Sequence, residues 1–184
     1  MRGITIIAAS LGLLALPAGH AGAQVTRAVP PAAARLDPFS QRLLDLHNAE
    51  RRAVGAVPLR WNPLLQAHAQ AYAQHLAQLG RLEHAPRQGR GAERENLAQG
   101  LPGWGPEQLA QGWVGEKRYF HAGVFPAICS GDEWGCTHFT QMIWPSTTEV
   151  GCGLAQGGGY QWLVCRYLPG GNRDGQLVGL PARP

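Results

Sequence analysis

Two stretches in the first half of the chain place apolar side chains at helical spacing. Each follows a helix-capping residue and a proline, Asp37-Pro38 in the first case and Asn62-Pro63 in the second. Gly80 is suited to the left-handed conformation that closes the second helix. The pattern therefore predicts helices over about 38–53 and 63–79.

The pattern changes along the second half of the chain. Residues 81–105 are rich in Gly, Arg and Pro and indicate an irregular segment. Beyond it we expect a helix over 106–119, a loop over 121–137, a short helix from His138 that ends by Pro145, and strands over 149–154 and 161–167 joined by three glycines. Helices followed by a hairpin predict an α+β domain with a small antiparallel sheet.

The first residues have the layout of a cleavable signal peptide. Arg2 is followed by an uncharged apolar stretch, and small residues ending at Ala23 follow Pro17. The apolar stretch is too short to span a bilayer, and no later segment is long enough. We expect a signal peptide over 1–23, a flexible lead-in over 24–38, one domain over 39–176 and a tail over 177–184, in a protein that is secreted or periplasmic.

The charge of the chain is mildly positive, with a formal net charge of +4. The basic residues are not clustered into the face that nucleic-acid binding usually requires, so we expect no nucleic-acid partner. The run from Arg87 to Arg94 is interpreted as a solvated loop, although it could steer acidic ligands.

Four cysteines lie in the last third of the chain, at positions 129, 136, 152 and 165. An even number in an exported chain favours disulfides, and four cysteines allow three pairings. Proximity in the sequence favours Cys129–Cys136 and Cys152–Cys165. A structural zinc site is the competing interpretation, but the chain lacks a C-x2-C pair.

Five segments in order resemble one known family. "LLDLHNAERRAVG", "ENLA", "WVGEKRYF", "HFTQMIW" and "VCRYLPGGN" are similar to the opening helix, the two acidic segments and the two signatures of the CAP superfamily of cysteine-rich secretory, antigen 5 and pathogenesis-related proteins. The resemblance runs from about Leu43 to about Gly175. It implies a three-layer α-β-α sandwich of the CAP (SCP) type, and the two cysteine pairs flank its two signatures.

The resemblance also implies a cleft with two histidines and two glutamates. Matched by position, these are His84, Glu95, Glu116 and His138. In the family such histidines can bind Zn²⁺ or another divalent ion, while the glutamates orient them. A glycosidase acid pair is the alternative for Glu95 and Glu116.

Three classes of function stay open on this evidence. The first is an exported, monomeric binding protein for an apolar or amphipathic ligand, lipid or sterol-like, with Trp104, Val124 and Phe125 as contacts. The second is a metal-dependent extracellular hydrolase of peptides or cell-wall material, with Glu116 as general base. Ala85 stands where a serine is common in the family, which weakens this alternative. The third is a signalling or toxin-like interaction protein.

Overall fold

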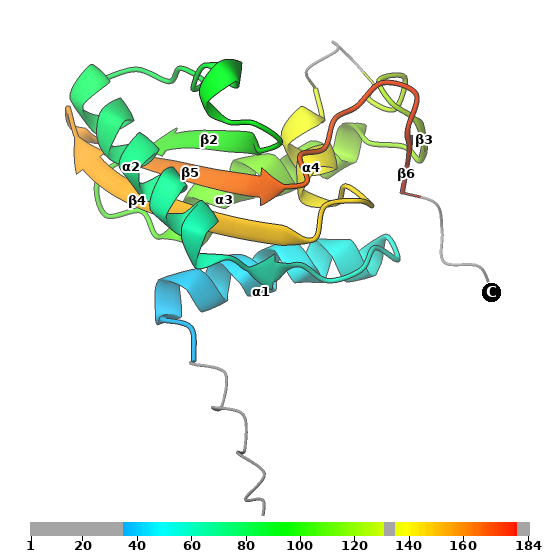
Figure 1. Ribbon diagram of the computed structural model, residues 1–184, viewed down its shortest axis with the longest axis horizontal. Helices are drawn as coiled ribbons and strands as arrows, with labels where there is room; N and C mark the ends of the chain where they lie inside the picture. Colours follow the sequence, from blue (N-terminus) through cyan, green and yellow to red (C-terminus); the bar gives the residue numbers. More distant parts are fainter. Residues whose placement is uncertain (1–34, 131–134, 180–184) are drawn as a thin grey trace, which may run out of the picture. The chain divides into compact units, whose positions relative to one another are not determined.

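The computed structural model describes residues 35–130 and 135–179 (Figure 1). The predicted signal peptide, almost all of the lead-in and the last residues of the tail lie outside this part of the chain. Within it, no helix is long and apolar enough to cross a membrane.

Helices and strands alternate from α1 to α4, with two short 3-10 helices (η) among them, and three strands follow. The elements are α1 (Pro38–Ala53), β1 (Arg60–Trp61), α2 (Pro63–Leu79), η1 (Arg87–Gly89), β2 (Arg94–Gly100), α3 (Pro106–Gly115), η2 (Glu116–Tyr119), β3 (Gly123–Val124), α4 (Thr137–Met142), β4 (Glu149–Gly157), β5 (Tyr160–Leu168) and β6 (Leu177–Val178).

The predicted helix starts are confirmed by their caps. The Asp37 carboxylate accepts hydrogen bonds from the backbone N–H groups of Phe39 and Ser40 at the start of α1. The Asn62 side chain likewise accepts from Leu64 and Leu65 at the start of α2. Gly80 ends α2 with a φ of 74°.

Four strands form the main sheet in the order β1-β4-β5-β2. The predicted hairpin is the antiparallel pair β4–β5, in which Cys152 lies opposite Cys165. β2 pairs antiparallel with β5, and the short β1 joins β4 in parallel. The α+β prediction is confirmed, with β1 as a parallel addition to the antiparallel sheet.

Two apolar cores occupy the two faces of this sheet, which gives the predicted three layers. One face packs against α2 through Leu76, Trp162 and Val164 among others. The opposite face packs against α1, α3 and α4, with Leu43 and Trp113 among the contributing residues. Figure 1 shows α2 crossing in front of β4 and β5, with α3 behind them.

Three local predictions differ from the structure. The segment expected to be irregular contains β2, whose residues Glu95, Asn96 and Leu97 are all buried. The third helix stops at Gly115 and tightens into η2. The first residues of the predicted tail form β6, which pairs with β3 in the predicted loop. Two-residue strands such as β3 and β6 are too short for an alternation to be seen in the sequence, and the polar residues of β2 hide its burial.

Both favoured disulfides are present, Cys129–Cys136 and Cys152–Cys165, and no cysteine in the described residues is free. The second bond joins the two arms of the hairpin on the face that packs against α1 and α3. The zinc alternative for these cysteines is thereby excluded.

Glycines on β4 allow α2 to lie directly on the sheet. A Cβ atom at Gly151 or Gly153 would overlap the backbone of α2, at Gln66 in the first case and Gln70 in the second. The Gln70 side chain then bonds both backbone groups of Leu154, at 2.9 and 3.0 Å. This contact covers an otherwise open strand edge and fixes the helix against β4.

A buried arginine ties α1 to the segment after α4. The Arg51 guanidinium, which is fully buried, donates to the carbonyl oxygens of Val57, Met142, Trp144 and Thr147. Burial lowers the pKa of Arg51 to about 10, so the group stays charged at neutral pH. These bonds satisfy the carbonyl groups at the end of α4 and set the position of that helix.

The glycine contact predicts a strong sensitivity to a single methyl group. Gly153→Ala should lower the free energy of unfolding by about 2 kcal/mol or more, because the added Cβ overlaps backbone that cannot move independently of α2. Chemical denaturation of the purified protein measures this.

Gly112→Ala is the matched control. Gly112 lies within α3, and a Cβ there would meet nothing within 4 Å. This variant should be neutral or stabilised by up to about 1 kcal/mol. Equal losses in the two variants would contradict the close packing of α2 on β4.

Candidate functional site

A cavity of about 680 Å³ opens beside β2 and α4. Its lining combines ionisable, amide and apolar side chains from segments distant in the sequence. They are His84, Arg87, Arg90, Arg94, Glu95, Asn96, Phe125, Pro126, Thr137, His138, Gln141, Asn172 and Asp174. Both predicted histidines and one predicted glutamate therefore face one cavity.

The first histidine of the site is held by a glutamate of β2. His84 lies in the loop before η1, and its Nδ1 lies 2.8 Å from Oε1 of Glu95. The same oxygen accepts a hydrogen bond of 2.7 Å from the backbone N–H of Ala85. The Glu95 side chain is fully buried, and its Oε2 forms a 3.0 Å ion pair with Arg166. One carboxylate therefore fixes both the imidazole and the backbone of this loop.

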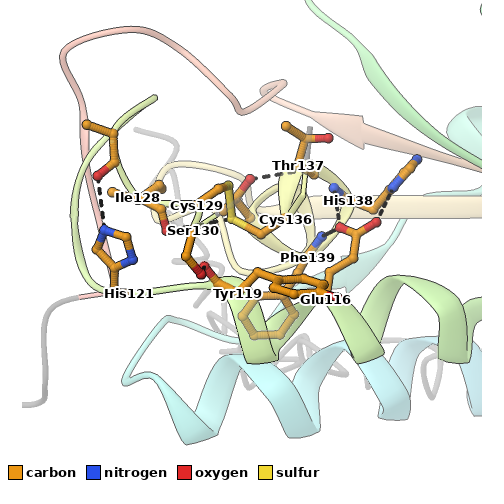
Figure 2. Close-up of a disulfide and its surroundings, with 12 residues drawn as sticks. Glu116, Tyr119, His121, Ile128, Cys129, Ser130, Cys136, Thr137, His138 and Phe139 are labelled. Carbon is orange, nitrogen blue, oxygen red and sulfur yellow. Dashed lines mark hydrogen bonds and ion pairs between the residues drawn. A yellow bond between two sulfur atoms is a disulfide. The ribbon is translucent and has the colours of Figure 1, made fainter. Parts of the chain in front are cut away.

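The second histidine is held in the same way at the start of α4 (Figure 2). Oε1 of Glu116 lies 2.6 Å from Nδ1 of His138, and Oε2 accepts from the backbone N–H groups of His138 and Phe139. The carboxylate thus satisfies donors that the first turn of a helix leaves unpaired. Trp113 stacks against the His138 ring at a centroid distance of 6.2 Å.

These bonds decide which imidazole nitrogen is available. A carboxylate accepts hydrogen bonds, so each neutral histidine carries its proton on Nδ1 and its lone pair on Nε2. Within the described residues, Nε2 of His84 and Nε2 of His138 have no partner. Both nitrogens are therefore free to accept a hydrogen bond or to bind a cation.

The two free Nε2 atoms suit a divalent metal ion, but they supply only two of its ligands. A carboxylate on the far nitrogen is the usual support for a metal-binding histidine. Among residues 35–130 and 135–179, no group of three or more His, Cys, Asp or Glu side chains has a metal-binding arrangement. The site thus offers two imidazoles, and further ligands would come from solvent or from a bound molecule.

A buried polar network supports the site from behind. Asn96 donates to the backbone oxygen of His138 and to the hydroxyl of Tyr167, at 3.0 and 3.1 Å. Nε2 of His47 lies 2.9 Å from the same hydroxyl, while Nδ1 of His47 bonds Leu43 O. Burial lowers the pKa of His47 to about 4 and raises that of Tyr167 well above its usual value. Both groups are neutral, and His47 is a buried polar contact on the core side of α1.

The disulfide Cys129–Cys136 braces the approach to His138. Cys136, which is joined to Cys129 in Figure 2, precedes α4 directly. Cys129 forms a β-bridge with Phe120 just after η2. The backbone N–H of Ser130 donates to Tyr119 O at 2.7 Å. The disulfide, together with these backbone contacts, thus links the segment that carries Glu116 to the helix that carries His138.

The three predicted ligand contacts occupy different surroundings. Phe125 lines the cavity and packs edge-on against Trp144. Val124 is half exposed and lies opposite the exposed Leu177 in the β3–β6 pair. Trp104 lies over Gly100 and is absent from the cavity lining, so the structure does not bring it to the site.

Several cavity residues were not identified from the sequence. The arginine run was interpreted as a solvated loop, yet only 7% of the Arg90 side chain is exposed and Arg94 is half-buried. Gly170 makes room for Arg94, since a Cβ there would overlap its side chain. The signal for these residues was the run of arginines between His84 and Glu95.

Comparison with known proteins assigns the family. Residues 44–167 match the family model for CAP, the cysteine-rich secretory protein family. A pathogenesis-related protein PR-1 of Medicago truncatula is 35% identical over 141 residues, which is 75% of this chain and 78% of the relative. The Golgi-associated plant pathogenesis-related protein 1 of Homo sapiens is 33% identical over 135 residues, or 73% and 84% of the two chains.

Solved structures share the fold. The venom allergen-like protein 4 of Schistosoma mansoni has a TM-score of 0.61 at 25% identity, covering 81% of this chain and 97% of that one. The structure of NaASP2 with Zn²⁺ has a TM-score of 0.64 at 22% identity, covering 79% and 87%. The chain belongs to the CAP family of cysteine-rich secretory proteins, as its motifs and its three layers indicated.

The role of Glu116 at the start of α4 is testable by stability. Glu116→Gln replaces an acceptor oxygen by an amide that faces backbone donors, so we expect a loss of about 1–3 kcal/mol in the free energy of unfolding. Glu107→Gln is the control, since Glu107 pairs with Arg42 on the surface and should cost at most about 1 kcal/mol. Equal losses in thermal or chemical denaturation would contradict a structural role for the Glu116 carboxylate.

Proposed function

We propose that the protein is an exported CAP-domain protein that binds an apolar or amphipathic, sterol-like or lipid ligand in this cleft. The observation that carries the proposal is one cavity whose lining combines the apolar side chains of Phe125 and Pro126 with the imidazoles of His84 and His138. Its volume lies in the range of small-molecule sites. Val124 and Leu177 are not part of the lining, but they form a half-exposed apolar pair on the short β3–β6 sheet, and Val124 directly precedes Phe125 in the sequence.

Export is part of this proposal. The apolar N-terminal stretch and the two disulfides support an oxidising destination, either the external medium or the periplasm.

We favour binding over hydrolysis because of how the glutamates are engaged. A general base needs a lone pair that can take a proton from water. Glu116 accepts three hydrogen bonds from His138 and Phe139, and the fully buried Glu95 accepts hydrogen bonds from His84 and Ala85 and is ion-paired with Arg166. Both carboxylates therefore act as positioning groups for the two histidines.

Ligand binding can be tested with dehydroergosterol, an uncharged fluorescent sterol. The purified protein should bind it, and replacing Val124 and Leu177 together by Asp should weaken binding by about tenfold or more, because an exposed apolar pair that includes the sequence neighbour of Phe125 becomes charged. Both side chains are exposed, so folding should be retained. Titration of sterol fluorescence measures the affinity.

Leu64→Asp provides the control for this pair. Leu64 is exposed as well, but it lies in α2 and is absent from the cavity lining. Its variant should bind the sterol like the wild type. The proposal fails if the wild type retains no sterol, or if all three proteins bind equally.

The two histidines form the second part of the proposal, as the residues that would hold a divalent ion. NaASP2, a structural neighbour, has been solved with Zn²⁺. Bound at Nε2 of His84 and His138, such an ion would supply Lewis acidity toward the polar end of a ligand. The Nδ1 bonds to Glu95 and Glu116 would hold both rings in place.

Calorimetric titration with Zn²⁺ tests this part directly. The wild type should show a saturable site that His138→Ala loses, since one of two imidazole ligands is gone. His75→Ala is the control, because His75 is exposed on α2 and stacks on Tyr72 away from the cavity. Equal zinc affinity in the wild type and in His138→Ala would contradict the proposed metal site.

A further inference from the structure

One wall of the cavity is built from arginines in the segment between His84 and Glu95. Arg87 belongs to η1, Arg90 follows it, and Arg94 begins β2. All three line the same cavity as the histidines. We call these three residues the arginine wall.

The arginine wall has donors that the described protein leaves unused. The Nε of Arg90 is buried and has no hydrogen-bond partner, although its Nη1 lies 3.6 Å from Glu95. Arg94 donates one bond, from Nη1 to the backbone oxygen of Glu93. Within the described residues, the side chain of Arg87 has no partner. A buried donor without a partner is costly unless a bound molecule or water satisfies it.

The carboxylates around the cavity do not neutralise the arginine wall. Glu95 is shared among His84, Arg90 and Arg166, and Glu93 is shared between His68 and Arg166. Asp174 is the remaining lining carboxylate, and it forms no ion pair within the described part of the chain.

Crowding of like charges is visible at Arg94. Burial lowers the pKa of Arg94, and the positive charges of Arg87, Arg90 and Arg173 lower it further. Three of these four guanidinium groups line a cavity in which a single lining carboxylate is uncommitted, and the fourth, that of Arg173, adds its charge nearby. The positive charges would attract a bound anion, and the anion would reduce the repulsion between the guanidinium groups.

We propose that the arginine wall binds a phosphomonoester group, with Arg87, Arg90 and Arg94 donating to its oxygens. The proposal rests on the proposed function, since it assigns the polar end of the ligand to the same cleft. Guanidinium groups donate paired N–H bonds that match a tetrahedral oxyanion. Three guanidinium groups offer more N–H donors than the two oxygens of one carboxylate can accept. A phosphomonoester presents three terminal oxygens as acceptors.

The positions of the other lining residues suit a ligand with two unlike ends. Phe125 and Pro126 line the cavity together with the arginine wall. A phosphate at the arginines would leave the apolar part of the ligand toward Phe125 and the exposed Val124 and Leu177. The phosphate could belong to a soluble phosphomonoester or to the headgroup of a lipid such as phosphatidic acid.

Binding of inorganic phosphate and of phosphatidic acid vesicles tests the proposal on the full mature protein. At low ionic strength the wild type should bind at least one of these, and binding should weaken as salt is added. The double variant Arg87→Gln and Arg94→Gln should bind at least about tenfold more weakly, because two charged donors are lost. Arg90 is left intact because it also contacts the buried Glu95.

The control has the same net charge. Arg52 and Arg60 are exposed and absent from the cavity lining, and the double variant Arg52→Gln and Arg60→Gln should bind like the wild type. Vesicles of phosphatidylcholine alone should not bind. Binding of inorganic phosphate identifies the free group as sufficient, and binding of phosphatidic acid alone identifies the lipid headgroup as the source. Failure to bind either probe, or equal binding by the two double variants, overturns the proposal.

The sterol titration separates this inference from the proposed function. Loss of phosphate binding with retained dehydroergosterol binding in the Arg87 and Arg94 variant supports both. Phosphate binding by a wild type that binds no sterol supports the arginine wall and overturns the apolar ligand. Sterol binding without phosphate or phosphatidic acid binding overturns the arginine wall alone.

Discussion

Two glutamate carboxylates hold the cleft together, and each bonds an imidazole and the neighbouring backbone at once. Glu95 joins the loop at His84 and Ala85 to strand β2, and Glu116 joins η2 to the first turn of α4. Because each bond engages Nδ1, both histidines present Nε2 as an acceptor. The chemistry available to the cleft therefore follows from where these two carboxylates are fixed.

The rest of the fold keeps those carboxylates in position. Glu95 lies in β2, whose partner β5 is held from one side by the close contact of α2 and from the other by a disulfide to β4. Behind α4, Arg51 ties its end to α1, and Asn96 ties His138 to the Tyr167 hydroxyl. A shift of α2 or of α4 relative to the sheet would alter the distance between a glutamate and its histidine. The arginine wall adds positive charge to this frame, and that charge weakens the binding of a cation at the histidines and favours the binding of an anion beside them.

The sequence allowed the parts with strong local signals to be predicted. Capping at Asp37 and Asn62 located two helices, and the cysteine spacing and glycine turn located the hairpin. The four cleft residues came from family motifs, since nothing in their spacing relates Glu116 to His138. Strand β2 was missed because its buried polar residues Glu95 and Asn96 look like solvent-facing ones until their partners are known. The burial of the Arg90 side chain likewise depends on a tertiary contact, its ion pair with Glu95, which the sequence does not reveal.

The imidazole tautomers of His84 and His138 test the central claim most directly. Nitrogen-15 NMR of the wild-type protein at about pH 8, where histidine is ordinarily neutral, distinguishes a protonated Nδ1 from a protonated Nε2. The account predicts the Nδ1–H form for both residues, because each Nδ1 lies within 2.8 Å of a carboxylate oxygen. A predominant Nε2–H form at either histidine would contradict it.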